Sequence, residues 1–228
     1  MAQFWTAMLE WLDKADKSLL LALNGLHNGF FDGFMWLYSD KWVWLPLYLL
    51  LIFLMVKTAR KNAVWYLLFV VLSIAAADQL ASGLCKPFFA RLRPLHATDL
   101  QGLVHTVAGC GDLYGFMSSH AANCFALAMF TSLYFKRRSF TTAMFAWAAV
   151  NAYSRIYLGM HYPGDLLAGA LSGMGIAWGM YALAHWLVNR RRHKPLQYQL
   201  SNAEMHSVWL VLGVTVFLLG VSGRFLFQ

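Results

Sequence analysis

The chain has 228 residues, of which 60% are hydrophobic and only 12% are charged. An average soluble domain is about half apolar and about a quarter charged, so this composition excludes most soluble classes. It also excludes intrinsic disorder, which requires low hydrophobicity. About six membrane spans of about 20 residues each would use roughly 120 residues and leave enough chain for loops. The composition therefore predicts an all-α fold, a polytopic membrane helical bundle.

The chain begins with a segment that we expect to lie in the membrane interface. Apolar side chains of residues 4–23 recur at helical spacing, and charged side chains occupy the opposite face. Residues 19–40 leave an alternative open, because they could supply another span or a re-entrant pair. The apolar runs that could cross a membrane are residues 42–57, 62–84, 119–135, 140–157, 163–188 and 206–226.

These runs predict about six transmembrane helices after one N-terminal amphipathic helix. They divide the chain into an amphipathic segment at 1–41, a central membrane domain at 42–188, and a basic linker with a last transmembrane helix at 189–228. Gly169, Gly173, Gly175 and Gly179 have the small-residue spacing that favours close helix packing.

Basic residues indicate the topology. The chain has 18 Lys and Arg against 10 Asp and Glu, an excess that could indicate a nucleic-acid partner. Ten of the 18, however, lie in three groups that directly follow apolar runs: Lys57, Arg60 and Lys61; Lys136, Arg137 and Arg138; Arg190, Arg191, Arg192 and Lys194. This is the positive-inside pattern, which predicts three cytoplasmic loops and no nucleic-acid partner. The loops 85–118 and 158–163 and both chain ends are then expected outside.

The cysteines do not predict a metal site, and the first 17 residues do not predict a cleavable signal peptide. The three cysteines, Cys85, Cys110 and Cys124, have no metal-ligand spacing. Cys85 and Cys110 could both lie outside the membrane and form a disulfide, or all three could be unrelated thiols. The acidic residues of the first 17 positions argue against a cleavable signal peptide.

Polar residues outside the basic groups gather in three segments near span ends. The segments hold Lys86 and Arg93-Pro94; Ser118-Ser119-His120; and Ser154-Arg155 followed by His161 and Asp165. The predicted topology brings all three to one membrane face. Arginine donates planar, bidentate hydrogen bonds and lysine supplies a point charge, so the cations suit a phosphate dianion. Ser118 as an N-cap would aim free backbone N–H groups at the same anion.

The three segments resemble the three-part signature of the type 2 phosphatidic acid phosphatase family, the membrane relatives of vanadium haloperoxidases. Lys86 to Pro94 matches K-x6-R-P, and Ser154 to Asp165 matches S-R-x5-H-x3-D in full. The second pattern, P-S-G-H, matches at Ser118 and His120 only, because Met117 and Ser119 replace Pro and Gly. The resemblance covers residues 43–188, and the substitutions bear on loop geometry rather than reaction class.

The resemblance implies a catalytic role for three residues. His161 would be the nucleophile, Asp165 would orient it, and His120 would be the general acid and then the base. The residues expected to bind the phosphate are Lys86, Arg93, Ser118, Ser119 and Arg155. Arg91 could join this site or reach lipid headgroups, and Asp78 could pair with a site cation or, preferably, support a neighbouring helix. The family needs no metal and no cofactor.

The resemblance makes the central domain a catalytic phosphatase domain that acts through a phosphohistidine. Its partners would be a lipid phosphate substrate and membrane lipids, and the oligomeric state stays open. The compact length and charge pattern favour a multi-pass protein of a bacterial inner (plasma) membrane, with its active site facing the periplasm or cell exterior. They slightly favour undecaprenyl diphosphate, for which Arg91 offers an extra partner. Phosphatidylglycerol phosphate, phosphatidic acid and lipid A 1-phosphate are the alternatives. An anion transporter or channel is the alternative of another class. The loop 95–115 could be a lid or a simple connector.

Overall fold

The computed structural model describes residues 1–107, 111–190 and 197–226. Within them the structure is almost entirely helical, with no strand beyond an isolated bridge between Leu92 and Tyr114. The long helices are α1 (Ala2–Asn24), α2 (Gly29–Tyr38), α3 (Leu45–Ala59), α4 (Ala63–Asp78), α6 (Ser119–Phe135), α7 (Arg138–Tyr157), α8 (Pro163–Asn189) and α9 (Asn202–Leu226). Helix α4 continues through a π-helical segment, Gln79–Cys85, into the short helix α5 (Lys86–Phe89). The all-α prediction is confirmed.

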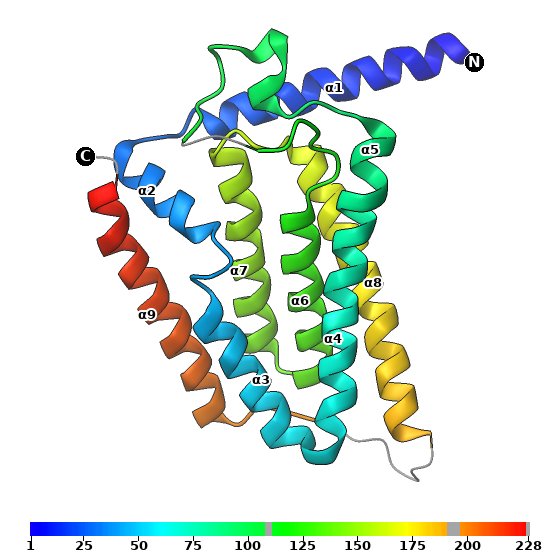
Figure 1. The fold of residues 1–228 in the computed structure, drawn as a ribbon, viewed down its shortest axis with the longest axis vertical. Coiled ribbons are helices and arrows are strands. Elements are labelled where there is room, and N and C mark those ends of the chain that lie inside the picture. The colour runs from blue at the N-terminus through cyan, green and yellow to red at the C-terminus, as the bar shows by residue number, and fades with distance from the viewer. Residues whose placement is uncertain (108–110, 191–196, 227–228) are drawn as a thin grey trace.

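The helices form a bundle with α1 lying across one end (Figure 1). The connections 90–118 and 158–162 lie at that same end. The connections from α3 to α4 and from α6 to α7 lie at the opposite end. The basic residues Lys57 to Lys61 and Lys136 to Arg138 fall on these opposite connections, as the charge pattern predicts. Of the third basic group, Arg191, Arg192 and Lys194 lie outside the described residues, as does Cys110 of the expected disulfide.

Three helical segments in the described ranges are long and apolar enough to cross a membrane: Leu45–Phe89, Pro163–Asn189 and Asn202–Leu226. Helix α6 has only 17 residues. Helix α7 carries the buried polar residues Asn151, Ser154 and Arg155, which lower its hydropathy. The count of about six spans therefore stays a prediction.

Among the described residues, no helix in the region 19–40 is by itself long and apolar enough to cross a membrane. Helix α2 has 10 residues and runs from the α1 end toward the middle of the bundle (Figure 1). The helical path is then interrupted at residues 39–44, and α3 continues in the same general direction. Together, α2 and α3 make one interrupted passage. Its break lies beside the start of α6, since the backbone of Ser39 hydrogen-bonds to His120.

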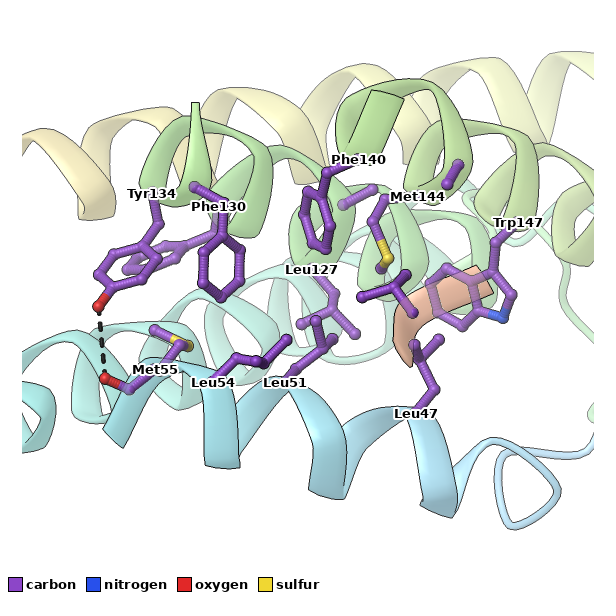
Figure 2. Packing of buried hydrophobic residues seen from close by; sticks show 14 of the residues in the cluster. Leu47, Leu51, Leu54, Met55, Leu127, Phe130, Tyr134, Phe140, Met144 and Trp147 are labelled. Carbon is purple, nitrogen blue, oxygen red and sulfur yellow. Dashed lines mark hydrogen bonds between the residues drawn. The ribbon is translucent and has the colours of Figure 1, made fainter. Parts of the chain in front are cut away.

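The core fixes α6 at the centre of the bundle. Figure 2 shows apolar side chains of α3 meeting those of α6 and α7: Leu47, Leu51, Leu54, Met55, Leu127, Phe130, Tyr134, Phe140, Met144 and Trp147. On another side, Gly173 of α8 lies so close to α6 that an added methyl group would overlap the carbonyl of Ala122. Gly169 similarly faces the carbonyl of Ser118. The predicted close helix packing is confirmed at Gly169 and Gly173, and it places the start of α6 against the start of α8. It is wrong at Gly175 and Gly179, where an added Cβ would meet nothing within 4 Å.

Candidate active site

The structure brings the three polar segments together at the end of the bundle covered by α1. Lys86 begins α5, Arg93 follows α5, and Ser118 precedes α6. Arg155 lies in the last turn of α7, and His161 lies in the short connection to α8. His120 of the second segment lies within electrostatic range of Arg93 from the first segment and of Arg155 and His161 from the third.

His161 and Asp165 form a buried pair. His161 Nδ1 lies 3.3 Å from Asp165 Oδ2, and the two side chains are 2% and 0% exposed. The same Oδ2 accepts a hydrogen bond from the backbone N–H of Tyr162 at 3.1 Å. A carboxylate only accepts hydrogen bonds, so it selects the imidazole tautomer with the proton on Nδ1. That tautomer leaves the lone pair on His161 Nε2.

Burial sets the protonation state of His161. Desolvation lowers the pKa of His161 to about 4, although the hydrogen bond that His161 donates to Asp165 opposes this shift. His161 is therefore neutral at pH 7. A neutral imidazole with a free Nε2 lone pair is the form in which histidine acts as a nucleophile.

Two of the predicted phosphate-binding cations, Arg93 and Arg155, lie within electrostatic range of His161. Lys86 Nζ and Arg93 Nη2 each lie 3.5 Å from Asp112 Oδ2, so the two cations are close to each other. The Arg155 side chain is buried, and its Nη2 contacts the sulfur of Met160 at 2.6 Å. Its Nε has no hydrogen-bond partner among the described residues. Buried donors are almost always satisfied in proteins, so this atom indicates that the site accepts an oxyanion.

Ser118 caps α6 as predicted. Its side chain accepts a hydrogen bond from the backbone N–H of Ala121 at 3.4 Å, and its own N–H donates to the carbonyl of Asp165 at 3.1 Å. The N–H groups of Ser119 and His120 belong to the first turn of the helix, where no helical carbonyl is available to them. They supply the kind of donors that bind anions at helix starts.

Arg91 belongs to this site because it forms an ion pair with Asp165. Its Nη1 donates to Asp165 Oδ1 at 2.9 Å, and its guanidinium stacks on the Tyr162 ring at 3.9 Å from the ring centroid. Its Nη2 lies 3.1 Å from Asp13 and 2.9 Å from Asp16. Sequence reasoning missed these two α1 carboxylates. Their signal was an acidic pair three residues apart on one face of an amphipathic helix.

The end of the outer loop lies directly against the buried pair. Gly115 donates its backbone N–H to the carbonyl of Arg91 at 2.8 Å. An added Cβ at Gly115 would lie 3.1 Å from Asp165 Oδ2 and 3.6 Å from His161 Nδ1. The absence of a side chain therefore permits this close approach.

Asp78, the last residue of α4, accepts a hydrogen bond from Asn123 of α6 at 3.1 Å. This contact is the one expected of a residue that supports a neighbouring helix.

A cavity of about 570 Å³ extends from His120 into the bundle between α3, α4 and α6. Its polar end includes Lys41, Ser119 and His120, and its remaining wall is mostly apolar. The cavity therefore joins a polar group at the site to a space with the chemistry of a lipid chain.

This fold and this site define a class. A helical membrane bundle that gathers cations, two imidazoles and a buried carboxylate at one end has the composition of a membrane protein that acts on phosphate groups. The sequence profile of the PAP2 superfamily matches residues 62–192, which span α4 to α8. The chain belongs to the PAP2 superfamily, and the predicted resemblance is confirmed.

Curated relatives narrow the class. A lipid A 4'-phosphatase of Bacteroides thetaiotaomicron is 40% identical over 186 residues, 80% of this chain and 83% of that protein. A lipid A 4'-phosphatase of Porphyromonas gingivalis is 38% identical over 78% of this chain and 79% of its own length. The crystal structure of a PAP2-type phosphatidylglycerolphosphate phosphatase from Bacillus subtilis shares the fold. Its TM-score is 0.63 at 17% identity, over 80% of this chain and 89% of that one.

The chain is therefore a bacterial membrane protein and a lipid phosphatase, a phosphoric monoester hydrolase. Membership of an enzyme family leaves the transporter alternative without support.

Proposed function

We propose that this enzyme removes the 4'-phosphate of lipid A through a phosphohistidine on His161. The observation that carries the reaction is the buried His161–Asp165 pair beside a buried arginine whose Nε has no partner among the described residues. The substrate is supported by the two relatives that are named lipid A 4'-phosphatases and are 40% and 38% identical.

The proposed chemistry proceeds in two balanced steps. His161 Nε2 attacks the phosphorus, the bond from phosphorus to the lipid oxygen breaks, and His120 donates a proton to that leaving oxygen. Water then attacks the phosphohistidine, gives its proton to His120, and the bond from phosphorus to nitrogen breaks. Asp165 stabilises the imidazolium that forms, because its carboxylate already accepts the Nδ1–H.

The remaining residues would bind the phosphate and stabilise its negative charge, and they would not transfer protons. Lys86, Arg93 and Arg155 would bind the phosphoryl oxygens, and the first-turn N–H groups of α6 with Ser118 and Ser119 would bind them from the other side. Phosphoryl transfer depends mainly on positioning and electrostatic stabilisation, and these residues are of the types that can supply both.

The cavity next to His120 supports a lipid substrate. His120 would protonate the leaving oxygen, so the leaving group must lie on the His120 side of the phosphate. The cavity that begins at His120 is lined farther in by apolar residues such as Leu51, Leu67 and Leu127. A lipid body attached to the leaving oxygen would therefore find an apolar environment there.

Arg91 bears on the choice between a monophosphate and a diphosphate. The sequence slightly favours undecaprenyl diphosphate, for which Arg91 could contact a second phosphate. In the structure, carboxylates occupy both terminal guanidinium nitrogens of Arg91, since Asp165 binds Nη1 and Asp13 and Asp16 bind Nη2. This arrangement favours a monoester substrate, with undecaprenyl diphosphate as the alternative.

We also propose six membrane passages, with α1 in the interface and the active site facing the periplasm. The passages are α2 with α3, α4 with α5, α6, α7, α8 and α9. The basic connections at the end opposite the site support this orientation, because cytoplasmic loops are rich in lysine and arginine.

The test is phosphate release from bisphosphorylated lipid A by purified enzyme in detergent. We expect loss of one phosphate per lipid, at the 4'-position by fragmentation mass spectrometry. We expect no release by His161→Ala and normal release by His206→Ala, which changes an exposed histidine of α9. Parallel assays use undecaprenyl diphosphate, phosphatidylglycerol phosphate, phosphatidic acid and lipid A that lacks the 4'-phosphate. Activity of His161→Ala would refute the phosphohistidine mechanism. Faster phosphate release from another lipid would refute the proposal that lipid A is the substrate.

A further inference from the structure

The N-terminal helix α1 reaches the proposed nucleophile through a continuous chain of charged contacts. Asp16 Oδ2 lies 2.9 Å from Arg91 Nη2. Arg91 Nη1 lies 2.9 Å from Asp165 Oδ1, and Asp165 Oδ2 lies 3.3 Å from His161 Nδ1. Helix α1 lies outside the residues that the superfamily profile matches, 62–192.

We propose that Asp16 is a positioning residue for catalysis, so that α1 is a working part of the active site rather than only an interfacial anchor. The inference rests on the proposed function, in which Asp165 orients His161. Asp16 holds the guanidinium of Arg91 in the place where its other nitrogen fixes Asp165. The carboxylate of Asp165 can then present Oδ2, and only Oδ2, to the imidazole.

A second contact ties Asp16 directly to the helix that carries Asp165. Asp16 Oδ1 accepts a hydrogen bond from the backbone N–H of Gly164 at 2.7 Å. Gly164 lies in the first turn of α8 and immediately precedes Asp165. A carboxylate at this position also interacts favourably with the positive end of the helix dipole. Asp16 thus holds both the residue before Asp165 and the cation that binds it.

Asp13 contacts the same arginine but is the weaker of the two. Its side chain is 43% exposed, whereas that of Asp16 is 15% exposed. Asp13 is also paired with Lys17 at 2.6 Å, and Lys17 in turn pairs with Asp99. Exposed ion pairs contribute little because water screens them. We therefore assign the positioning role to Asp16 and only a supporting one to Asp13.

The need for Arg91 follows from the burial of Asp165. A carboxylate that is 0% exposed requires a cation or several donors to stay ionised. Arg91 supplies the cation at Oδ1, and the Tyr162 ring beneath its guanidinium restricts the plane in which it can lie. A guanidinium released by α1 would be free to tilt away, and Asp165 would lose its fixed orientation.

The expected effect separates catalysis from binding. Among the described residues, the hydrogen bonds and ion pairs of Asp16 go to Arg91 and Gly164, not to the expected phosphate-binding cations Lys86, Arg93 and Arg155. The loss of Asp16 should therefore leave the phosphate site in place. A misplacement of a reacting group by about 1 Å costs on the order of 100-fold in rate. Asp16→Ala is therefore expected to lower kcat about 10- to 100-fold and to change KM by less than about twofold.

The test compares Asp16→Ala, Asp16→Asn and Asp16→Glu with Glu10→Gln, which removes an exposed carboxylate from the same helix. The assay measures kcat and KM for phosphate release from lipid A, with elution volume and circular dichroism as checks on folding. Asp16→Asn keeps an acceptor for Gly164 but not the charge, so it tests the role if Asp16→Ala fails to fold. Glu10→Gln should match wild type, and Asp16→Glu should recover part of kcat.

Combination with Arg91→Ala completes the test. If Asp16 acts through Arg91, the double variant loses no more kcat than Arg91→Ala alone, because coupled residues are not additive. Wild-type kcat in a folded Asp16→Ala, a change confined to KM, or full additivity with Arg91→Ala would overturn the inference. His161→Ala distinguishes the two failures. If it stays inactive while Asp16→Ala is normal, only the role of α1 is wrong; if it is active, the proposed function is wrong.

Discussion

The carboxylate of Asp112 occupies a position between two cations that are expected to bind substrate. Its Oδ2 lies 3.5 Å from both Lys86 Nζ and Arg93 Nη2. The Asp112 side chain is 79% exposed, whereas the Lys86 and Arg93 side chains are 12% and 6% exposed. Asp112 therefore competes with a phosphate oxygen for these two cations. We predict that Asp112→Asn lowers KM and leaves kcat close to the wild-type value.

The magnitude follows from the exposure of Asp112. An exposed ion pair contributes about 0.2–1 kcal/mol. Two such pairs must be broken when phosphate binds, which makes about 0.4–2 kcal/mol together. Each 1.4 kcal/mol is a factor of ten, so KM should fall by roughly 2- to 30-fold. The upper end applies at low salt, because ions screen an exposed carboxylate.

The assay is steady-state phosphate release from lipid A in mixed micelles at fixed surface concentration, at low and high salt. The matched control is Asp99→Asn, which removes another carboxylate of the outer loop whose partner is Lys17 rather than a site cation. We expect an unchanged KM for the control. A KM for Asp112→Asn that equals or exceeds that of wild type would refute the reasoning, since Asp112 would then assist binding or stay clear of it.

Three further predictions concern packing and protonation. Gly115→Ala should lower kcat at least tenfold with normal folding, because its methyl group would press on Asp165 Oδ2 from 3.1 Å; a wild-type kcat would show that Asp165 can yield. Gly173→Ala should lower the unfolding free energy by about 1–3 kcal/mol in detergent, because the methyl group overlaps the Ala122 carbonyl. Gly175→Ala should not lower the unfolding free energy, because a Cβ added at Gly175 meets nothing within 4 Å. Equal losses of stability in the two variants would contradict the close contact of α6 and α8. The pKa of His161 is about 4 when folded and about 6.5 when unfolded, so the unfolded state binds more protons between these values and stability falls as the pH falls through them. At about pH 5 the loss is ~2 kcal/mol, and the thermal unfolding of His161→Gln should lack this part of the pH dependence.

Local pattern was enough to predict the helical class of the fold and to propose the residues of the site. Apolar runs identify helices because a membrane admits only segments that satisfy their own backbone hydrogen bonds. The spacing of four residues predicts that His161 and Asp165 lie close together. The structure pairs them, with His161 just before α8 and Asp165 in its first turn. The three polar segments could be assigned to one end of the bundle because basic connections mark the other.

The contacts that tune the site could not be predicted in this way. Asp16 and Gly164 lie 148 positions apart, and nothing in the periodicity of α1 indicates which helix start its acidic face will meet. The break between α2 and α3 and the approach of Asp112 to Lys86 likewise depend on how whole helices and loops pack. The sequence by itself determined which residues could hold and attack a phosphate, because that chemistry belongs to the side chains. Only the tertiary structure decided that Arg91 binds Asp165 and the carboxylates of α1, because a guanidinium binds whichever carboxylates the fold brings within about 3 Å of it.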